Sequence, residues 1–420
     1  MQVKLLMYGS HKMNDMKRVI VFFLTVSVTL SGYAFDFLTG GLKYSTNSDG
    51  ASVSVMRQDT SIKKAVIPDM VEYEGRTYKV TSIAPDGFLE CMHLTSVTIP
   101  SSVTLIGKQA FYACDSLTKF SVAKKNPCFA DIEGVLFNKN KDTLLSYPNR
   151  KAKRYVIPSG VVAIHEDAFC SGNNLRSLTI PESVSYIGRS IFIDCDNLAE
   201  VFCQGKTPPT IGGYRIGYLP GCIFYVPKST GKNYSSAPGW IYSTLNRINI
   251  IEKGTVTTYN VKLKEAGTFL EAIGKDNLNK VIKLTIAGPI NGTDIKIIRS
   301  ELPVLRILDL GDADIVSGGE SYCSKNDTTM DNVIGDNMFD FIPYWESLVL
   351  PKRLIRIGEH AISHGYRLRS ITLLTKTPPV LALSSFMLNV NCKLYVPKGC
   401  DAVYAKDSRW KVFYTEYGNK

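Results

Sequence analysis

Two histidines have a spacing that could serve a metal ion. His360 and His364 are four residues apart, and on a helix that spacing would place both imidazole rings on one face, as in zinc sites. No third ligand lies near them, and the repeat described below puts both residues in a turn. We therefore expect exposed turn histidines and no metal.

Three aspartates could in principle bind calcium. Asp309, Asp312 and Asp314 are clustered where a predicted strand ends, but calcium needs more oxygen ligands in a defined order. A solvated turn is the favoured interpretation. The sequence also contains no Gly-x-Ser-x-Gly, P-loop or dinucleotide fingerprint, and no paired carboxylates or triad can be assembled. We predict a protein that is not an enzyme and uses no cofactor.

The ten cysteines include no Cys-x-x-Cys pair, which argues against a metal cluster. Cys91, Cys114 and Cys195 share one position of the repeat, which predicts a column of small buried thiols. Cys323 lies in a polar loop and is the expected reactive thiol.

A disulfide between Cys203 and Cys222 is conceivable, because exported proteins keep such bonds. A second copy of the same module carries Cys392 in place of Cys222 but Leu373 in place of Cys203. A module that works without one partner does not need the bond, so we expect free thiols there.

The elements that position these residues follow from an internal repeat of about 23 residues. A phrase of the form apolar-x-x-apolar-x-apolar recurs, and its last three positions alternate as a half-buried strand requires. The copies are at residues 94–99, 117–122, 175–180, 198–203, 305–310 and 368–373.

A second phrase, Ile-Gly-x-x-Ala-Phe-x-x-Cys-x-x-Leu, lies between the strands and is clearest at residues 106–117. One such unit cannot bury its own apolar face, whereas stacked units can. The sequence therefore predicts an α/β-type repeat solenoid, largely β. Its leucine-rich repeats would form a parallel sheet on one face and turns or short helical turns on the other.

A longer repeat appears when the sequence is shifted by 170 residues. Residues 206–209, Lys-Thr-Pro-Pro, recur at 376–379, and Trp240 recurs as Trp410. We interpret residues 204–254 and 374–420 as terminal caps that cover the last strand edge.

The caps divide the chain into two tandem blocks. The first block would span residues 35–254, including an entry cap before the first repeat, and the second block residues 255–420. Residues 267–278 could hold a short helix, and residues 287–331 fit the 23-residue form poorly.

The N-terminus is typical of a secretory signal peptide. Met16-Lys17-Arg18 precedes an apolar run over residues 19–30, and a small-residue exit ends at Ala34. We predict a signal peptide at residues 1–34 with a possible true start at Met16, cleavage after Ala34, and an exported protein that is secreted, periplasmic or at the cell surface. The run is too short to span a membrane; the alternative is an N-terminal core strand.

Composition narrows the class further. The 420 residues are 45% hydrophobic and 10% aromatic, which is too apolar for a disordered chain. The net charge is +11, but the 49 Lys and Arg are scattered among 38 acidic residues. Since no dense basic block exists, we do not expect nucleic acid as a partner.

The sequence resembles the BspA-like leucine-rich-repeat proteins of bacterial surfaces. The resemblance is carried by residues 106–117, by an inserted Gly-Val-Leu-Phe-Asn at 134–138 with Tyr147-Pro148, and by the two Thr-Pro-Pro…Tyr-Val-Pro modules. It implies a secreted or surface-displayed protein of a host-associated anaerobe, within a family that includes adhesins for host matrix proteins. It provides no catalytic residues.

Most outward positions of the predicted strands are Ser or Thr, which suit a flat sheet. The larger exceptions are the candidate partner-binding residues Lys119, Arg154, Glu200 and Phe202. We predict a monomeric, non-enzymatic binding protein whose partner is a protein, with host extracellular-matrix proteins as candidates.

The alternative is a glycan-binding or envelope-structural protein. A glycan site should present outward aromatic rings, and Phe202 is the only one that the sequence places on the strand face. This favours a protein partner.

Overall fold

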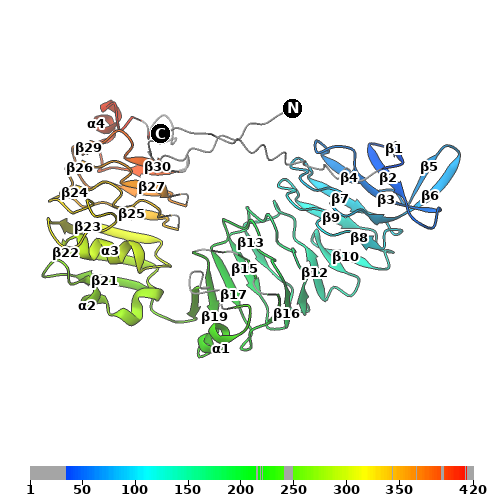
Figure 1. The fold of residues 1–420 in the computed structure, drawn as a ribbon, viewed down its shortest axis with the longest axis horizontal. Helices are drawn as coiled ribbons and strands as arrows, with labels where there is room; N and C mark the ends of the chain where they lie inside the picture. The colour runs from blue at the N-terminus through cyan, green and yellow to red at the C-terminus, as the bar shows by residue number, and fades with distance from the viewer. Residues whose placement is uncertain are drawn as a thin grey trace, which may run out of the picture.

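The computed structural model describes residues 35–213, 216–217, 219, 221–240, 249–342, 344–365, 367–388, 392–411 and 413. The expected signal peptide lies outside these residues. Figure 1 shows a solenoid that follows a curved path, with the N-terminal repeats at one end of the arc and α4 near the other. The predicted repeat solenoid, largely β and built of parallel strands, is confirmed.

Three successive sheets of parallel strands form what we call the front face, and every predicted strand phrase lies in one of them. Neighbouring strands pair with a register of one repeat, as in Ser96 with Lys119 and Ser177 with Glu200. In the first block these strands are β4 (Lys64–Val66), β7 (Ser96–Ile99), β9 (Lys119–Val122), β13 (Arg154–Val156), β15 (Ser177–Ile180), β17 (Glu200–Cys203), β19 (Ile223–Val226) and β20 (Asn249–Glu252).

A second ladder, which the sequence did not predict, runs along the opposite side, here called the back face. It begins with β6 (Arg76–Ile83) and continues with the short strands β8 (Leu105–Ile106), β12 (Thr143–Ser146), β14 (Ala163–Ile164), β16 (Tyr186–Gly188) and β18 (Thr210–Gly212). After β6, β8, β14 and β16 the chain makes a tight turn that contains two left-handed residues four positions apart, such as Gln109 (φ 53°) and Ala113 (φ 55°). These turns replace the helices of larger leucine-rich repeats.

The first block opens with antiparallel strands and contains one insertion. Strands β1 (Phe37–Thr39), β2 (Leu42–Thr46), β3 (Ser52–Arg57) and β5 (Met70–Tyr73) precede or flank β6. The insertion is a hairpin of β10 (Phe129–Ile132) and β11 (Val135–Asn138), which continues into β12. It separates the front sheet β4-β7-β9 from the front sheet β13-β15-β17-β19-β20.

The second block has its own front sheet and carries the larger helices. The front strands are β21 (Thr258–Lys262), β22 (Lys283–Ile290), β23 (Ile307–Ile315), β25 (Ser347–Val349), β28 (Ser370–Thr372) and β31 (Lys393–Tyr395). The back carries β24 (Val333–Ile334), β26 (Arg356–Ile357) and β29 (Val380–Leu381), and beside them β27 (Ile362–Gly365) with β30 (Phe386–Leu388).

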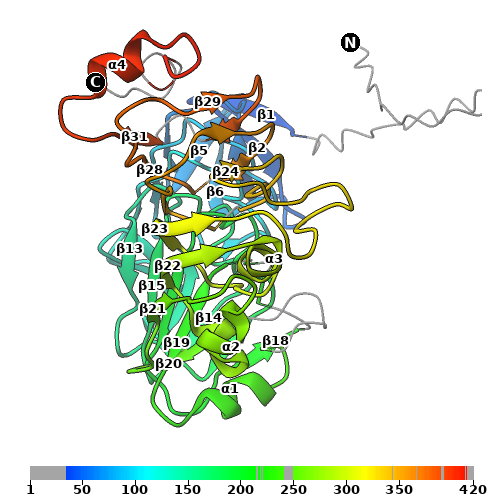
Figure 2. The same ribbon diagram turned by 90° about the vertical axis from the view of Figure 1, so that its left-hand side faces the viewer.

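The poor fit of residues 287–331 to the repeat has a structural cause. A helix, α3 (Gly292–Ser300), begins after β22 with a capping box between Asn291 and Asp294. The predicted short helix within 267–278 is present as α2 (Phe269–Ile273), followed by a 3₁₀ helix at Lys275–Lys280. Figure 2 shows α2 and α3 along one side of β21, β22 and β23.

The aspartate cluster lies in a strand, so the predicted solvated turn is wrong. β23 continues through residue 315 because it pairs with the unusually long β22 past a bulge. Asp312 forms an ion pair with Lys352 at 2.8 Å, and Asp314 with Arg353 at 3.2 Å. The carboxylates therefore face basic side chains of the next repeat.

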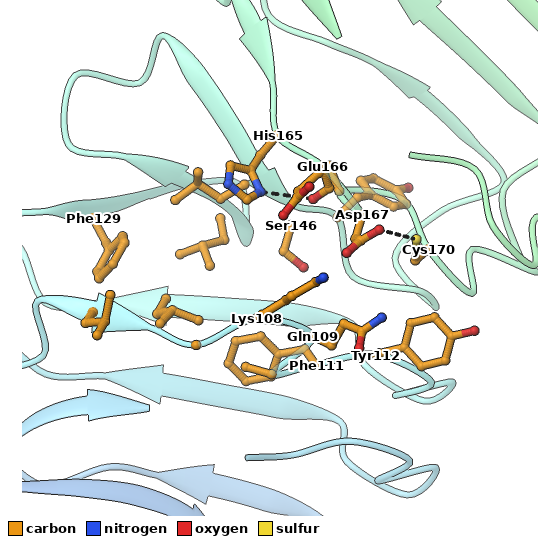
Figure 3. A pocket seen from close by; sticks show the side chains of 18 of the residues that line it. Lys108, Gln109, Phe111, Tyr112, Phe129, Ser146, His165, Glu166, Asp167 and Cys170 are labelled. Atoms are coloured by element: carbon orange, nitrogen blue, oxygen red, sulfur yellow. Dashed lines mark hydrogen bonds between the residues drawn. The ribbon is translucent and has the colours of Figure 1, made fainter. Parts of the chain in front are cut away.

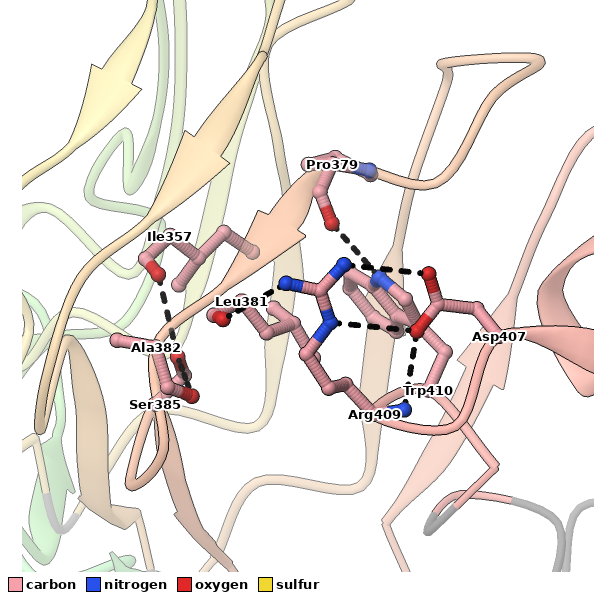
Figure 4. Close-up of polar contacts among 8 residues, drawn as sticks. All are labelled: Ile357, Pro379, Leu381, Ala382, Ser385, Asp407, Arg409 and Trp410. Atoms are coloured by element: carbon pink, nitrogen blue, oxygen red, sulfur yellow. Dashed lines mark hydrogen bonds and ion pairs between the residues drawn. The ribbon is translucent and has the colours of Figure 1, made fainter.

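The two modules interpreted as caps share one geometry. Each has a six-residue helix, α1 (Gly231–Ser236) or α4 (Asp401–Lys406), followed by a buried tryptophan. The indole of Trp240 donates to Pro209 at 2.9 Å, and that of Trp410 donates to Pro379 at 2.8 Å. Figure 4 shows Trp410 beneath Pro379, with Arg409 held between Asp407 and the carbonyl of Leu381.

The front ladder is interrupted between β20 and β21, and buried residues join the two blocks there. Arg306 is 7% exposed, and it donates to the carbonyls of Ala199 at 2.5 Å and Gly221 at 3.3 Å. The ring of Tyr344 covers Gly221 so closely that an added Cβ would lie 2.2 Å from it. A small apolar cluster seals the contact: Ile223, Ile251 and Val304, with Tyr225 and Ile282.

All ten cysteines are free thiols in the structure. The predicted column is confirmed, since Cys91, Cys114 and Cys195 are all buried. The thiols of Cys114 and Cys195 each donate, at 3.0 Å, to the carbonyl of a phenylalanine in the preceding repeat.

Candidate functional site

The front face of the first block carries three of the four candidate residues on one sheet. Arg154 of β13 lies in register with Ser177 and Glu200, so two strand spacings separate the first from the last. The neighbouring row consists of Val156, Thr179, Phe202 and Tyr225. Within that row Val156 is 65% exposed and Phe202 is 36% exposed. The row is therefore a largely apolar stripe, interrupted by Thr179, with Arg154 beside its outer end.

Phe202 does not stand alone, contrary to the sequence expectation that it was the only outward aromatic residue. Its ring stacks on that of Tyr225, with centroids 4.9 Å apart and ring planes 11° apart. Burial raises the pKa of the Tyr225 phenol, so the ring stays neutral at physiological pH. The repeat length could have predicted this neighbour, because Tyr225 follows Phe202 by one repeat of 23 residues.

Glu200 occupies a different setting from Arg154 and Phe202. One carboxylate oxygen lies 3.9 Å from Arg306 of the second block, which also lies 3.5 Å from Glu346. Glu200 therefore belongs to the contact between the blocks as well as to the front face. The sequence could not show this, because Arg306 is more than a hundred residues away.

Lys119 lies on β9, in the neighbouring front sheet β4-β7-β9. The insertion hairpin stands beside it: the N–H of Phe120 donates to Gly134 at 2.8 Å, and a Cβ on Gly134 would lie 2.8 Å from the Cβ of Lys119. The structure thus groups Arg154, Glu200 and Phe202 on one sheet and places Lys119 on another. Figure 1 shows β9 and β13 in successive parts of the same arc.

His360 lies in an exposed turn, as the repeat frame predicts, but His364 lies in β27 and is only partly exposed, so the expectation of an exposed turn histidine is wrong for His364. His360 (φ 49°) and His364 (φ 52°) have the same left-handed backbone as Gln109 and Ala113 in the first block. The Nδ1 atom of His364 lies 2.7 Å from the carboxylate of Asp340. Across the described part of the chain, no group of three His, Cys, Asp or Glu side chains is arranged to hold a metal ion.

Within the described residues, no helix combines the length and apolar character that a membrane crossing needs.

Comparison with known proteins identifies the repeat. The pattern of the BspA type leucine rich repeat region matches in six copies, over residues 58–146, 145–214 and 326–393, which together exceed half of the chain. No curated protein matches the chain.

The chain is similar to three solved leucine-rich-repeat structures. The first, from Bacteroides capillosus, is 26% identical, with 40% of this chain and 98% of that chain covered and a TM-score of 0.23. The second, from Bacteroides ovatus, is 16% identical, with 86% and 94% covered and a TM-score of 0.32. A leucine rich cell surface protein from Faecalibacterium prausnitzii is also 16% identical, with 89% and 98% covered and a TM-score of 0.28.

The match of the repeat pattern agrees with the stacked 23-residue units, the Ala-Phe turns and the duplicated Thr-Pro-Pro modules. The chain therefore belongs to the BspA-type leucine-rich-repeat family.

Proposed function

We propose that this chain is an exported, non-enzymatic binding protein that holds a protein partner on the front face of its first block. BspA-type repeat proteins are typically surface proteins that act through protein–protein interaction. The observation that carries the proposal is the pair of exposed side chains Val156 and Phe202, with the half-buried Tyr225 stacked on Phe202 and Arg154 beside Val156.

The physical reason is the concentration of binding energy in a few large side chains. Aromatic and Arg anchors contribute most of the free energy of binding at protein interfaces, and small neighbours contribute little. The Ser and Thr side chains around Phe202 leave it accessible, and the parallel sheet fixes its position. Host matrix proteins are the candidate partners that we propose to test first.

The test uses two double variants on equivalent front strands. Arg154→Ala with Phe202→Ala removes the proposed anchors, and Lys393→Ala with Tyr395→Ala removes an exposed cationic and aromatic pair from β31 of the second block. Purified host matrix proteins are immobilised, and binding of the mature chain is measured by surface plasmon resonance.

We expect the first variant to dissociate at least tenfold faster and the second to behave as the wild type. Lys119→Glu should mainly slow association and change its salt dependence. Equal affinity of the wild type and the Arg154, Phe202 variant would move the site off this face.

A glycan partner is the second candidate, and the Phe202–Tyr225 stack favours it specifically. Two neighbouring outward rings form a platform on which a sugar ring can stack. An oligosaccharide array probed with the wild type and the Tyr225→Ala variant separates the two candidates. Binding to the array that is lost in this variant, without binding to matrix proteins, would favour the glycan.

Export is tested independently of binding. When the chain is expressed with residues 16–34 present, we expect the exported form to begin at Phe35. N-terminal sequencing that finds Met1 or Met16 on the exported protein would contradict a cleaved signal peptide.

A further inference from the structure

The back ladder of the first block lacks one rung. β8 pairs with β6, and within the described residues it has no second partner, whereas β14 pairs with both β12 and β16. The gap lies between the turn that follows β8 and the turn that follows β14.

The gap has a cause in the sequence. The repeats on either side contain the Ala-Phe turn, as Ala110-Phe111 and Ala168-Phe169. The repeat between them runs from β12 through Tyr147-Pro148-Asn149 and returns early to the front, where the N–H of Arg150 donates to Leu117 at 2.7 Å. It therefore omits the turn that would otherwise fill this level of the back face.

The missing turn leaves backbone donors without acceptors. Phe88 and Phe169 each donate their N–H to the next repeat, at 2.8 Å to Ala110 and 3.2 Å to Ile191. Phe111 holds the same position in its own repeat, but no described residue accepts its N–H. The same difference recurs two residues further along the chain. The N–H groups of Glu90 and Ser171 donate to carbonyls of the next repeat, whereas no described residue accepts the N–H of Ala113.

A cleft of about 450 Å³ occupies this place, a volume within the range of ligand sites. Its apolar floor is formed by Ile106, Phe111, Phe129, Leu136 and Leu145. Figure 3 shows Ser146 pointing into the cleft and the Lys108 amine extending between the walls formed by residues 108–112 and 165–170.

One polar side chain of the cleft is also unsatisfied. Asn149 is only 6% exposed, and its amide nitrogen has no hydrogen-bond partner among the described residues. A buried donor of this kind costs free energy unless a ligand or water accepts from it. The wall thus offers a side-chain donor in addition to the backbone donor of Phe111, and the N–H of Ala113 follows directly after the lining residue Tyr112.

We propose that this cleft binds an extended peptide segment of a protein partner, which takes the place of the missing rung. Peptide carbonyls would accept from the free backbone donors, as in strand addition to a sheet edge. An apolar side chain of the peptide would fill the floor around Phe129 and Leu145. Both requirements, regularly spaced carbonyls and an apolar side chain, are met by a polypeptide. The site is separate from the front-face stripe, so it does not depend on the function proposed above.

The test uses a matched pair of Ser→Trp variants on opposite faces. Ser146→Trp fills the cleft, and Ser177→Trp places the same ring on the front strand β15. A phage-displayed library of random nine-residue linear peptides is selected on the wild-type mature chain, and enriched peptides are titrated by fluorescence polarisation.

We expect enriched peptides that bind Ser146→Trp at least tenfold more weakly and Ser177→Trp within twofold of the wild type. Hydrogen exchange should show that the bound peptide slows exchange of the amides of Phe111 and Ala113. Lys108→Trp provides a second block of the cleft, and it replaces Ser146→Trp if circular dichroism shows that the latter is unfolded.

Three results would overturn the proposal. The selection could enrich no peptide; the enriched peptides could bind both cleft variants as well as the wild type; or the amides of Phe111 and Ala113 could exchange at an unchanged rate. An oligosaccharide array tests the remaining alternative. If no peptide is enriched, and the wild type binds a sugar that the cleft variants do not bind, the cleft is a glycan site instead.

Discussion

Trp410 donates its indole N–H to the carbonyl of Pro379 at 2.8 Å, and the ring lies fully buried against Tyr404 and Phe413. Truncation of a buried Trp to Ala typically costs about 3–5 kcal/mol. We expect Trp410→Ala to lower the free energy of unfolding by that amount in urea titration. Leu383→Ala, at a side chain that is 100% exposed, is the control. An unchanged urea midpoint for Trp410→Ala would refute the capping role.

Arg306 should contribute far more to stability than an arginine in a surface ion pair. Hydrogen bonds that involve a charged group contribute about 1.5–3 kcal/mol, and Arg306→Ala removes those to Ala199 and Gly221. Arg353→Ala breaks only an exposed pair with Asp314, which is worth about 0–1 kcal/mol. Thermal unfolding of both variants tests this difference, and small-angle scattering of Arg306→Ala should show a less fixed angle between the blocks. Equal melting temperatures would mean that the junction does not depend on Arg306.

Glu252 gives a pH-dependent contribution to stability. Backbone N–H groups of Ser229 and Gly231 donate to its carboxylate and lower its pKa in the folded state. The unfolded carboxyl titrates near about 4.3, so the stabilisation is present above that pH and is lost as the pH falls through the lower folded pKa.

We therefore expect Glu252→Gln to melt at a lower temperature than the wild type at pH 7, and the difference to shrink as the pH falls below the ordinary Glu pKa of about 4.3. Glu265→Gln is the control, since no hydrogen bond or ion pair of its side chain occurs among the described residues. A difference in melting temperature that persists at low pH would show that the effect is steric.

The thiols should separate into the exposed Cys323, the half-buried Cys128 and Cys400, and a buried set. Cys323 is exposed, whereas Cys203, Cys222 and Cys392 are buried, and burial raises the pKa of each of these three thiols to about 12. Iodoacetamide at pH 8 should modify Cys323 first in the native protein, because the thiolate is the nucleophile.

The buried thiols should react only after unfolding in denaturant without a reductant. Peptide mass spectrometry reads the order of labelling. Failure of Cys203 and Cys222 to react in denaturant would reveal a disulfide between them.

The strand phrases were sufficient to predict front strands such as β7, β15 and β28, because a strand with one buried face alternates apolar and polar residues in the sequence. Most back strands pair over only two residues, which is too few to show an alternation of apolar and polar positions. The helix α3 was not predicted from the sequence, although Asn291 and Asp294 have the spacing of a capping box. The reason is that residues 287–331 were compared only with the 23-residue repeat.

The candidate site shows the same limit. Phe202 could be placed outward from its strand phrase, and Tyr225 could have been found by the same step. The contact of Glu200 with Arg306 depends on how two sheets meet, for which neither residue carries a local signal. The only sequence signal for the cleft is that the repeat after Leu144 lacks the Ala-Phe turn found in its neighbours.

The interrupted ladder between β20 and β21 has a consequence for a protein held at one end and pulled at the other. Within each unbroken front sheet, every strand is hydrogen-bonded to its neighbours, so tension is shared along a row of strands. Across the insertion of the first block, backbone bonds such as those of Phe120 to Gly134 and Arg150 to Leu117 continue the connection. At the junction the load falls on a few side chains around Arg306 and Tyr344. Under shear the arc should therefore straighten at this joint before any repeat unravels. The joint would lengthen the molecule and leave the front and back faces of each block intact.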